Sequence, residues 1–311
     1  MNPLNLPPTL PLARYRFIFT LQDDLLLPSY AGSTLRGVFG HSLRKITCMT
    51  KEPGCAHCPL LATCPYTRIF ANIEQGALNA SQKHTPPQAY IIEPPNNGKR
   101  FYNQGEEYQF DMVLFGHICE YLPLIAFAFS QAFHYGIGSR KSRGVLSNIQ
   151  IERNQEWQNI FENQKIIEHN YAFRLPEKYL SNIDIYFETP LRIQQQGKIL
   201  GTQNITAQHI VKQLLRRFSA LMQLYFAPIH LDIHKLMAYS EHIQGVAKNL
   251  LWYDWQRYSN RQKQSMKLGG IMGEWHFVDL PPEMAQLFYL GQWLHIGKET
   301  VFGLGKYRIK P

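Results

Sequence analysis

A histidine at position 41 stands among glycines and cations at helical spacing. The intervals of three and four residues place one set of side chains on a single helical face: Ser33, Gly37, Gly40, His41 and Arg44. Glycine costs about 1 kcal/mol at an interior helix position. Two glycines on one exposed face therefore indicate that a ligand or another chain approaches the backbone closely.

The chemistry that suits this face is proton transfer beside an anion. An imidazole titrates near neutrality, so His41 could accept or donate a proton. Arg36, Arg44 and Lys45 stand near it and could stabilise the charge that builds on a phosphorane. RNA carries its own nucleophile, the 2′-hydroxyl, so its cleavage needs neither a metal ion nor a covalent enzyme intermediate. The alternative is a surface histidine on a basic helix.

Four cysteines follow this helix in the pattern C-x6-C-x2-C-x5-C, at Cys48, Cys55, Cys58 and Cys64. Four thiolates suit a structural, tetrahedral zinc ion, because protein ligands fill every position. A four-iron four-sulfur cluster is the alternative, and His57 could replace one thiolate. In a reducing compartment a metal site is favoured over disulfides. Cys119 stands alone and is expected to be a packed core thiol.

Two glycine loops occur at the same offset in the two halves of the chain. The first runs from Gly136 to Gly144, and the second from Gly297 to Gly305. Each follows a helical run and precedes a strand, so neither is a Walker or a dinucleotide loop. They indicate phosphate contacts, or alternatively two tight turns. The candidate RNA-binding residues of these loops are Arg140, Lys141, Arg143, Gly297, Lys298, Gly303, Gly305 and Lys306.

A third basic stretch mixes aromatic and cationic residues between Trp252 and Lys267. Such mixing fits bases stacked on aromatic rings with phosphates nearby. The alternative is a strand with its aromatic face in the core, followed by a solvated basic turn. The candidate RNA-binding cations here are Arg257, Arg261, Lys263 and Lys267.

The elements that must position these residues are predicted twice in the order β-α-β-β-α-β, the ferredoxin-like unit. In the first half, strands are expected at 14–21, 89–92, 108–115 and 145–151, with helices at 33–45 and 123–133. In the second half, strands are expected at 183–188, 250–258, 270–278 and 306–309, with helices from 206 and from 281 to 293. The predicted class is α+β: two tandem ferredoxin-like (RRM-like) domains, with the cysteine knuckle inserted after the first helix. The domains span residues 1–153 and 182–311, and a bridge of turns and weak helix spans 154–181.

Composition points to an anionic partner. The chain has 311 residues, a formal net charge of +9 and 45% hydrophobic residues, which suits nucleic acid, an anionic membrane or a phosphorylated ligand. No apolar run of about eighteen residues predicts a transmembrane helix, and the N-terminus is unlike a secretory signal. We therefore expect a cytoplasmic protein.

Three stretches together resemble the RAMP superfamily of CRISPR-associated proteins, and within it the CRISPR precursor-RNA processing endoribonucleases. The first is Tyr30-Ala31-Gly32-Ser33-Thr34-Leu35-Arg36-Gly37 with the cysteine cluster, typical of one branch. The second is Tyr258-Ser259-Asn260-Arg261-Gln262 leading to Leu268-Gly269-Gly270. The third is the terminal motif G-h-G-x5-G-h-G, matched at Gly297, Gly303, Leu304 and Gly305, with His295 in place of the first glycine.

The resemblance implies metal-independent cleavage within the CRISPR repeat. The 2′-hydroxyl attacks the adjacent phosphate and leaves a 2′,3′-cyclic phosphate and a 5′-hydroxyl. His41 matches the family's general acid or base by position, and Tyr30, Arg44 and Lys45 are candidates for its support. Arg36, Gly37 and Gly40 are expected to contact the RNA. The implied partners are CRISPR repeat RNA and subunits of a CRISPR effector complex, with no membrane.

Two alternatives stay open from the sequence. One is a non-catalytic RNA-binding subunit of a CRISPR effector complex, which would use the same loops and fold. The other rests on the cysteines alone and is a cluster-bearing protein of DNA processing or redox chemistry.

Overall fold

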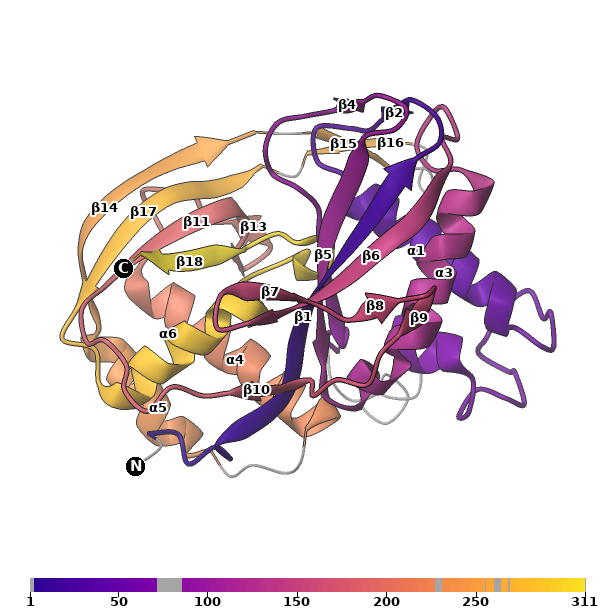
Figure 1. Ribbon diagram of the computed structural model, residues 1–311. Helices are drawn as coiled ribbons and strands as arrows, with labels where there is room; N and C mark the ends of the chain where they lie inside the picture. Colours follow the sequence, from indigo (N-terminus) through magenta and orange to yellow (C-terminus); the bar gives the residue numbers. More distant parts are fainter. Residues whose placement is uncertain are drawn as a thin grey trace. The chain divides into compact units, whose positions relative to one another are not determined.

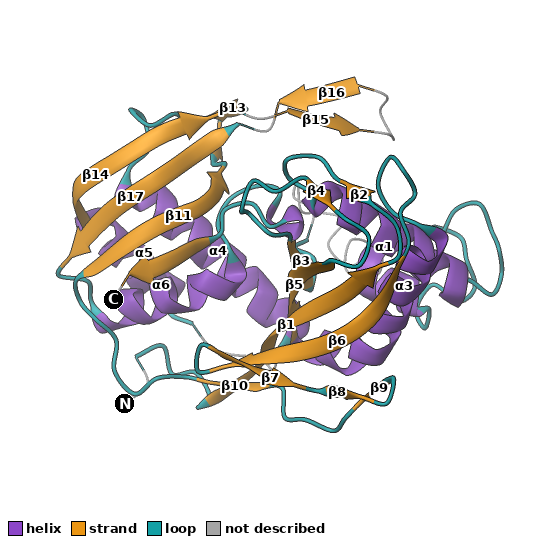
Figure 2. Cartoon of the chain, turned by 45° about the horizontal axis from the view of Figure 1, so that its top comes forward, coloured by secondary structure: helices purple, strands orange, loops and turns teal. Residues whose placement is uncertain are grey.

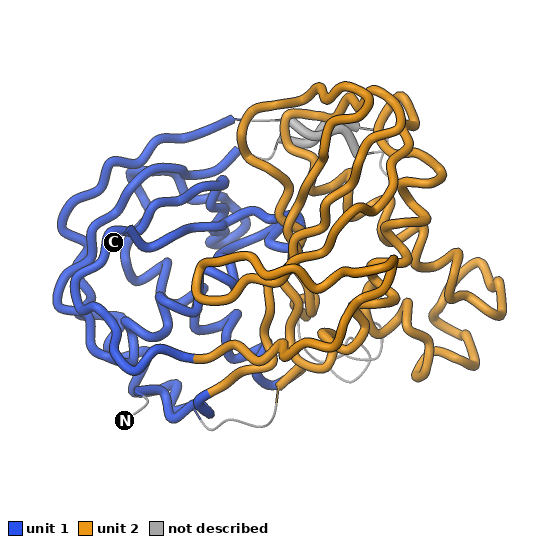
Figure 3. Tube along the Cα trace, viewed as in Figure 1, with its two compact units in different colours: residues 1–8, 175–223, 228–311 blue, residues 9–174, 224–227 orange. Residues whose placement is uncertain are grey.

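The computed structural model describes residues 3–71, 86–226, 231–254, 256–259, 264–267 and 269–310, and of residues 71, 256–259 and 264–267 only the backbone. The predicted RNA-binding side chains of Arg257, Arg261, Lys263 and Lys267 therefore lie outside the described part. The chain forms two compact units (Figure 3). The N-terminal unit comprises residues 9–174 and 224–227, and the C-terminal unit comprises residues 1–8, 175–223 and 228–311. The predicted domain limits stay predictions.

Long antiparallel strands and two helices build the N-terminal unit (Figure 1). Its main sheet has the strand order β3-β5-β1-β6-β7, and β10 pairs with the start of β1. Four strands alternate with the helices along the chain, as the sequence predicts. The elements are β1 (Thr9–Leu21), α1 (Gly32–Thr47), β3 (Tyr90–Glu93), β5 (Glu107–Phe115), α3 (Leu122–Tyr135) and β6 (Gly144–Arg153).

Smaller elements fill the connections of this unit. The predicted bridge at 154–181 is wrong in its local structure, because it contains short strands instead of a weak helix. The smaller elements are β2 (Leu25–Leu26), a π-helical turn (Thr67–Ala71), β4 (Phe101–Tyr102), a 3-10 helix (Gly116–Tyr121), β7 (Glu156–Asn159), β8 (Phe161–Glu162), β9 (Lys165–Ile166) and β10 (Ala172–Arg174).

Aromatic rings join the helices of this unit to its sheet. The face of α1 opposite His41 is apolar and faces the sheet, and Phe39 at its centre is fully buried. Its ring stacks on Phe129 of α3 with 4.8 Å between centroids, and Phe133 of α3 stacks on Phe19 of β1 at 3.7 Å. Both helices lie on one face of the sheet (Figure 2). The position of α1, and with it the position of His41, is therefore fixed by packing from the opposite side of the helix.

The four sheet strands of the C-terminal unit have the same order along the chain and in the sheet as β3, β5, β1 and β6 of the N-terminal unit. Its sheet runs β14-β17-β11-β18, all antiparallel, with the helices over one face (Figure 2). The elements are β11 (Ile183–Leu191), β12 (Gln194–Gln195), β13 (Lys198–Ile199), α4 (Ala207–Tyr225), α5 (Ile233–His242), β14 (Gln244–Tyr253), β15 (Gln256–Ser259), β16 (Gln264–Lys267), β17 (Gly270–Val278), α6 (Pro282–Leu294), a 3-10 turn (Thr300–Phe302) and β18 (Tyr307–Lys310).

Periodicity predicted α4 and α6 well, and the α+β class is confirmed. On α4 the predicted apolar face is buried, with Ile210, Leu214 and Phe218 at 0% exposure. Two elements differ from expectation: α5 was not predicted, and β14 begins at Gln244, well before the expected residue 250. Among the described residues, no helix is long and apolar enough to cross a membrane.

Candidate active site and nucleic-acid interface

His41 lies on the exposed side of α1 and borders a cavity of about 210 Å³. Helix α1 provides one wall and the end of α3 the other, so the two helices that pack on the sheet also frame the cavity. The lining residues are Gly37, Val38, His41, Ser42, Lys45, Ala132, Tyr135 and Gly136.

Two functional groups share this cavity with the imidazole. Lys45 follows His41 by one helical turn, and its Nζ lies 3.7 Å from the ring centroid of Tyr135, a cation–π contact. Tyr135 is 57% exposed, so its hydroxyl is accessible to a ligand. The arrangement combines an imidazole, an ammonium group and a phenol. Such a set is suited to proton transfer beside a phosphate.

Tyr135 is the site residue that sequence reasoning missed. It is the last residue of α3, directly before the first glycine loop. An exposed tyrosine that ends an otherwise apolar helix was the available signal. From the sequence, that helix was predicted to end near Phe133, and Tyr30 was the predicted tyrosine.

Tyr30 and Arg44, both expected to support His41, are not in its cavity. Tyr30 is only 7% exposed, and burial raises its pKa well above the usual range. Arg44 points to the cysteine loop, where its Nη2 donates to the carbonyl oxygens of Glu52 and Pro53 at 2.5 and 3.0 Å. Neither side chain borders the space beside His41. The structure therefore does not bring Tyr30 and Arg44 to the imidazole, and the supporting roles predicted for them stay predictions.

The two glycines of α1 have different surroundings. Gly37 is exposed and has no atom within 4 Å of where a Cβ would stand, so it leaves open space in the His41 cavity. Gly40 is buried, and a Cβ there would overlap the ring of Phe70. The same ring carries the guanidinium of Arg36, with Cζ 4.5 Å from its centroid. The expectation that Gly40 is exposed to a ligand is wrong, since Phe70 of the same chain covers it.

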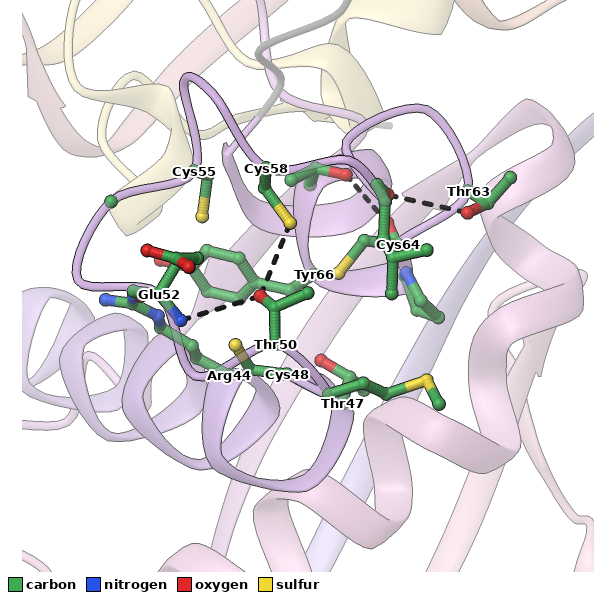
Figure 4. A pocket seen from close by; sticks show the side chains of 15 residues that line it. Arg44, Thr47, Cys48, Thr50, Glu52, Cys55, Cys58, Thr63, Cys64 and Tyr66 are labelled. Atoms are coloured by element: carbon green, nitrogen blue, oxygen red, sulfur yellow. Dashed lines mark hydrogen bonds between the residues drawn. The ribbon is translucent and has the colours of Figure 1, made fainter.

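The four cysteines of the predicted knuckle line one cavity of about 130 Å³ after α1. Cys48 caps the end of the helix, and the other three come from the loop. Their sulfur atoms point toward a shared space (Figure 4). Cys58 Sγ lies 3.4 Å from Thr50 Oγ1. In the part of the chain that the structure describes, no three His, Cys, Asp or Glu side chains lie close enough together to hold a metal ion as they stand.

The first glycine loop is a tight turn closed on itself and fastened to the segment before β2. Ile137 and Ser142 exchange two backbone hydrogen bonds of 2.9 Å. Arg143 makes a bidentate salt bridge with Asp23, in which Nε donates to Oδ2 at 2.8 Å and Nη2 donates to Oδ1 at 3.1 Å. This contact lowers the pKa of Asp23 to about 2. The side chain of Arg143 thus already has an anionic partner, whereas Arg140 and Lys141 are exposed.

The second glycine loop is packed against its own chain. Gly303 and Gly305 are buried. Gly305 has φ of +69°, and a Cβ there would overlap the carbonyl oxygen of Ile296. Thr189 of β11 fastens the loop, donating from Oγ1 to the Gly303 oxygen at 2.8 Å. The backbones of Gly303 and Gly305 are therefore covered in this structure, and the RNA contact predicted for them stays a prediction.

The remaining candidates of the second loop differ in accessibility. Gly297 has φ of +91° and lies against the carbonyl oxygen of Arg192, which accepts from the N–H of Lys298 at 2.8 Å. The side chain of Lys298 is exposed. Lys306 Nζ lies 3.8 Å from Glu188 Oε2. Of this loop, Lys298 has the side chain best placed to meet a ligand.

The aromatic stretch before residue 255 lies on the surface. Trp252 is 41% and Tyr253 48% exposed, at the end of the edge strand β14. The alternative in which these rings pack into the core is wrong. Trp252 donates from Nε1 to Asp254 Oδ1 at 2.7 Å, so a carboxylate neighbours it.

Two family models match the chain, one in each half. Residues 185–307 match the family model of the CRISPR-associated endoribonuclease Cas6, and residues 10–172 match a model described as an N-terminal domain. The C-terminal part of the chain is therefore similar to the CRISPR-associated endoribonuclease family Cas6. The family that this model describes is, by its name, one of RNA-cleaving enzymes. No curated protein is similar enough in sequence to count as a relative.

Solved structures show the same fold at low sequence identity. A Cas6 product complex is 12% identical with a TM-score of 0.58 and covers 96% of this chain and 100% of its own. Thermus thermophilus Cas6 is 11% identical with a TM-score of 0.54, covering 98% and 100%. A partial Cas6-RT-Cas1–Cas2 complex is 14% identical with a TM-score of 0.59, covering 99% of this chain and 47% of the other. At such identities the likeness concerns the fold.

Proposed function

We propose that this protein cuts CRISPR repeat RNA within the precursor transcript without a catalytic metal ion. The observation that carries the proposal is the shared cavity of His41, Lys45 and Tyr135. The match to the CRISPR-associated endoribonuclease model supports RNA as the substrate class, and we infer from the family's CRISPR association that this RNA is the CRISPR transcript. As a processing enzyme of CRISPR RNA with reduced cysteines, the protein would act in the cytoplasm.

In the proposed reaction the RNA attacks itself. The 2′-oxygen forms a bond to the adjacent phosphorus, and the bond from that phosphorus to the 5′-oxygen breaks. A base removes the 2′-hydroxyl proton, and an acid gives a proton to the leaving 5′-oxygen. The products are a 2′,3′-cyclic phosphate and a 5′-hydroxyl. His41 acts as acid or base, Tyr135 is the candidate for the second proton transfer, and Lys45 stabilises charge on the phosphorane.

The donor set of the cavity supports a mechanism without a metal ion. None of its eight lining residues is an Asp or a Glu. Magnesium prefers carboxylate and other oxygen ligands, and two-metal nucleases hold their ions with such groups. The ammonium group of Lys45, which also lines the cavity, can supply the positive charge that a metal ion would otherwise provide.

The test is cleavage of repeat RNA in EDTA. Wild-type protein should give one cut that ends in a cyclic phosphate. His41→Ala should slow the cut by about 10²- to 10⁴-fold and should still bind a repeat with a 2′-deoxy group at the cut site. His234→Ala, which removes an exposed histidine of α5, is the control. Tight binding without cleavage by the wild-type protein would contradict the proposal and select a non-catalytic RNA-binding subunit.

We also propose that Cys48, Cys55, Cys58 and Cys64 hold a structural zinc ion. The donor type fits, since four thiolates complete a tetrahedral site, and all four line one cavity with their sulfur atoms facing inward (Figure 4). When bound, zinc would supply cross-linking and no chemistry of its own. Arg44, which fastens the cysteine loop to the last turn of α1, would couple that cross-link to the helix of His41.

Metal analysis of purified protein tests the zinc proposal. We expect about one zinc per chain and no absorbance near 400 nm. Cys58→Ser should lose the metal and lower the melting temperature. Cys119→Ser is the matched control, because Cys119 is a buried thiol outside the cluster whose pKa burial raises to about 12. A brown protein containing iron would contradict zinc and select the four-iron four-sulfur cluster.

A further inference from the structure

An exposed phenylalanine stands beside the first glycine loop. Phe101 belongs to the two-residue strand β4, pairs with Leu26 of β2, and is 40% exposed. The guanidinium of Arg140 lies over its ring, with Cζ 5.6 Å from the centroid. Figure 1 shows β2 and β4 side by side at one end of the N-terminal unit. Phe101 thus places an aromatic ring at the surface beside the guanidinium of an exposed arginine, outside the core of this unit.

The loop is held rigidly against the ribbon of β2 and β4. Gly138 has φ of +72° and lies so close to the backbone that a Cβ would stand 2.8 Å from the Leu26 oxygen. Ser142 Oγ donates to the Asp24 oxygen at 2.6 Å. Together with the contact between Arg143 and Asp23, these bonds fix the loop on both sides of Arg140 and Lys141. The arrangement of Phe101 beneath the loop is therefore built into the fold.

The surface around Phe101 carries net positive charge after its ion pairs are counted. Lys99 is paired with Glu106 at 3.0 Å, and Arg143 is paired with Asp23. Arg140 and Lys141 are exposed, and no ion pair involves either of them within the described residues. Lys141 also has a positive φ of 52°, a conformation that is uncommon away from glycine. Two accessible cations and one accessible ring thus lie on a single fixed surface.

We propose that Phe101, Arg140 and Lys141 form a binding site for one unpaired nucleotide of the RNA. The base would stack on Phe101, and the adjoining phosphates would contact the two cations. Every base has a π face, and stacking on an aromatic ring needs a base that is out of its duplex. This inference rests on the proposed RNA-processing function and adds to it a place where single-stranded sequence beside the cut is held.

The site lies a short distance from the cavity of His41. Gly136 borders that cavity and Arg140 follows it by four residues, so the connecting backbone spans at most about 14 Å. At about 3.4 Å per stacked nucleotide, that length corresponds to roughly four nucleotides. The bound nucleotide should therefore be within about four positions of the scissile phosphate.

Fluorescence of 2-aminopurine locates the site. The base analogue is placed in turn at each position near the cut of a repeat RNA that carries a 2′-deoxy group there. Wild-type protein should quench one position by stacking. Phe101→Leu should abolish that quench and weaken binding roughly tenfold, whereas Phe101→Trp should keep both. Phe127→Leu is the matched control, because Phe127 of α3 is 51% exposed but lies outside the patch.

Salt dependence tests the two cations separately. Replacing Arg140 and Lys141 by Ala should reduce the slope of log affinity against log salt by about 0.7 for each lost phosphate contact. Arg143→Ala should change that slope less. Equal melting temperatures of the variants show that the fold is intact.

The outcomes separate this inference from the function on which it rests. If wild-type protein cuts repeat RNA but Phe101→Leu binds and quenches like wild type, the nucleotide site is overturned and the enzyme stands. If wild-type protein neither binds nor cuts repeat RNA, the proposed function is contradicted, and this site falls with it.

Discussion

His41 and Lys45 could be predicted as neighbours from sequence because both lie on one helix, where spacing decides which residues are neighbours. Tyr135 was missed because it belongs to a different helix, and only the packing of α1 and α3 on one sheet brings it to His41. Tyr30 was predicted because of its nearness in sequence. It is close to α1 along the chain, but its side chain is buried instead of facing the cavity.

Two tyrosine variants compare these assignments directly. Tyr135→Phe should lower the rate of repeat cleavage by about 10²-fold, because it removes a proton-transfer group from the cavity. Tyr30→Phe should leave the rate close to that of wild type, since that hydroxyl is outside the cavity. Single-turnover rates with excess enzyme are the measurement. A larger loss with Tyr30→Phe than with Tyr135→Phe would reverse the assignment.

The contact between Asp23 and Arg143 makes a prediction about pH. Arg143 lowers the pKa of Asp23 to about 2, so the contact stabilises the loop above the unfolded-state value near 3.9. This contribution is lost as the pH falls from about 4 to about 2. An NMR titration of the Asp23 carboxyl should show a midpoint near 2, and Arg143→Ala should return it to about 4. An unshifted midpoint in the wild-type protein would show that the contact does not persist in solution.

At the scale of elements, periodicity predicted the long helices and strands because each buries one face. The elements that sequence reasoning missed carry weaker patterns. Helix α5 buries only Leu236 and Ser240, and β2 and β4 are two residues each. Strand β14 was placed too late because most of its side chains are exposed and show no alternation. Such elements are set by neighbouring strands and loops, which the local sequence does not reveal.

The two glycines of α1 should respond differently to alanine. Gly37→Ala should stabilise the protein by about 0.5–1 kcal/mol, since the methyl group meets open space and alanine favours helix. The same methyl group narrows the His41 cavity, so cleavage should become slower. Gly40→Ala should lower stability by about 1–3 kcal/mol, because Phe70 must move from its aromatic neighbours. Thermal denaturation and cleavage rates measure both effects, and equal stability changes would contradict the packing described here.

At the scale of the whole molecule, charge sets how the protein meets its substrate. With a net charge of +9, the affinity for repeat RNA should fall about tenfold or more between about 50 and 200 mM salt, through release of counterions. Binding titrations across that range, with the 2′-deoxy repeat, are the measurement. An affinity that does not change with salt would show that phosphate contacts contribute little.

The buried glycines of the C-terminal loop have a consequence for recognising related proteins. Gly303 and Gly305 hold the end of the chain against β11 and are covered by it, so selection for folding alone would preserve them. A descendant that had lost His41, Lys45 and Tyr135 would still need these glycines to fold. The glycine motif would thus persist in proteins that share only the fold. On the proposed mechanism, the residues around the cavity at α1 would be the ones to compare when asking whether a related chain cuts RNA.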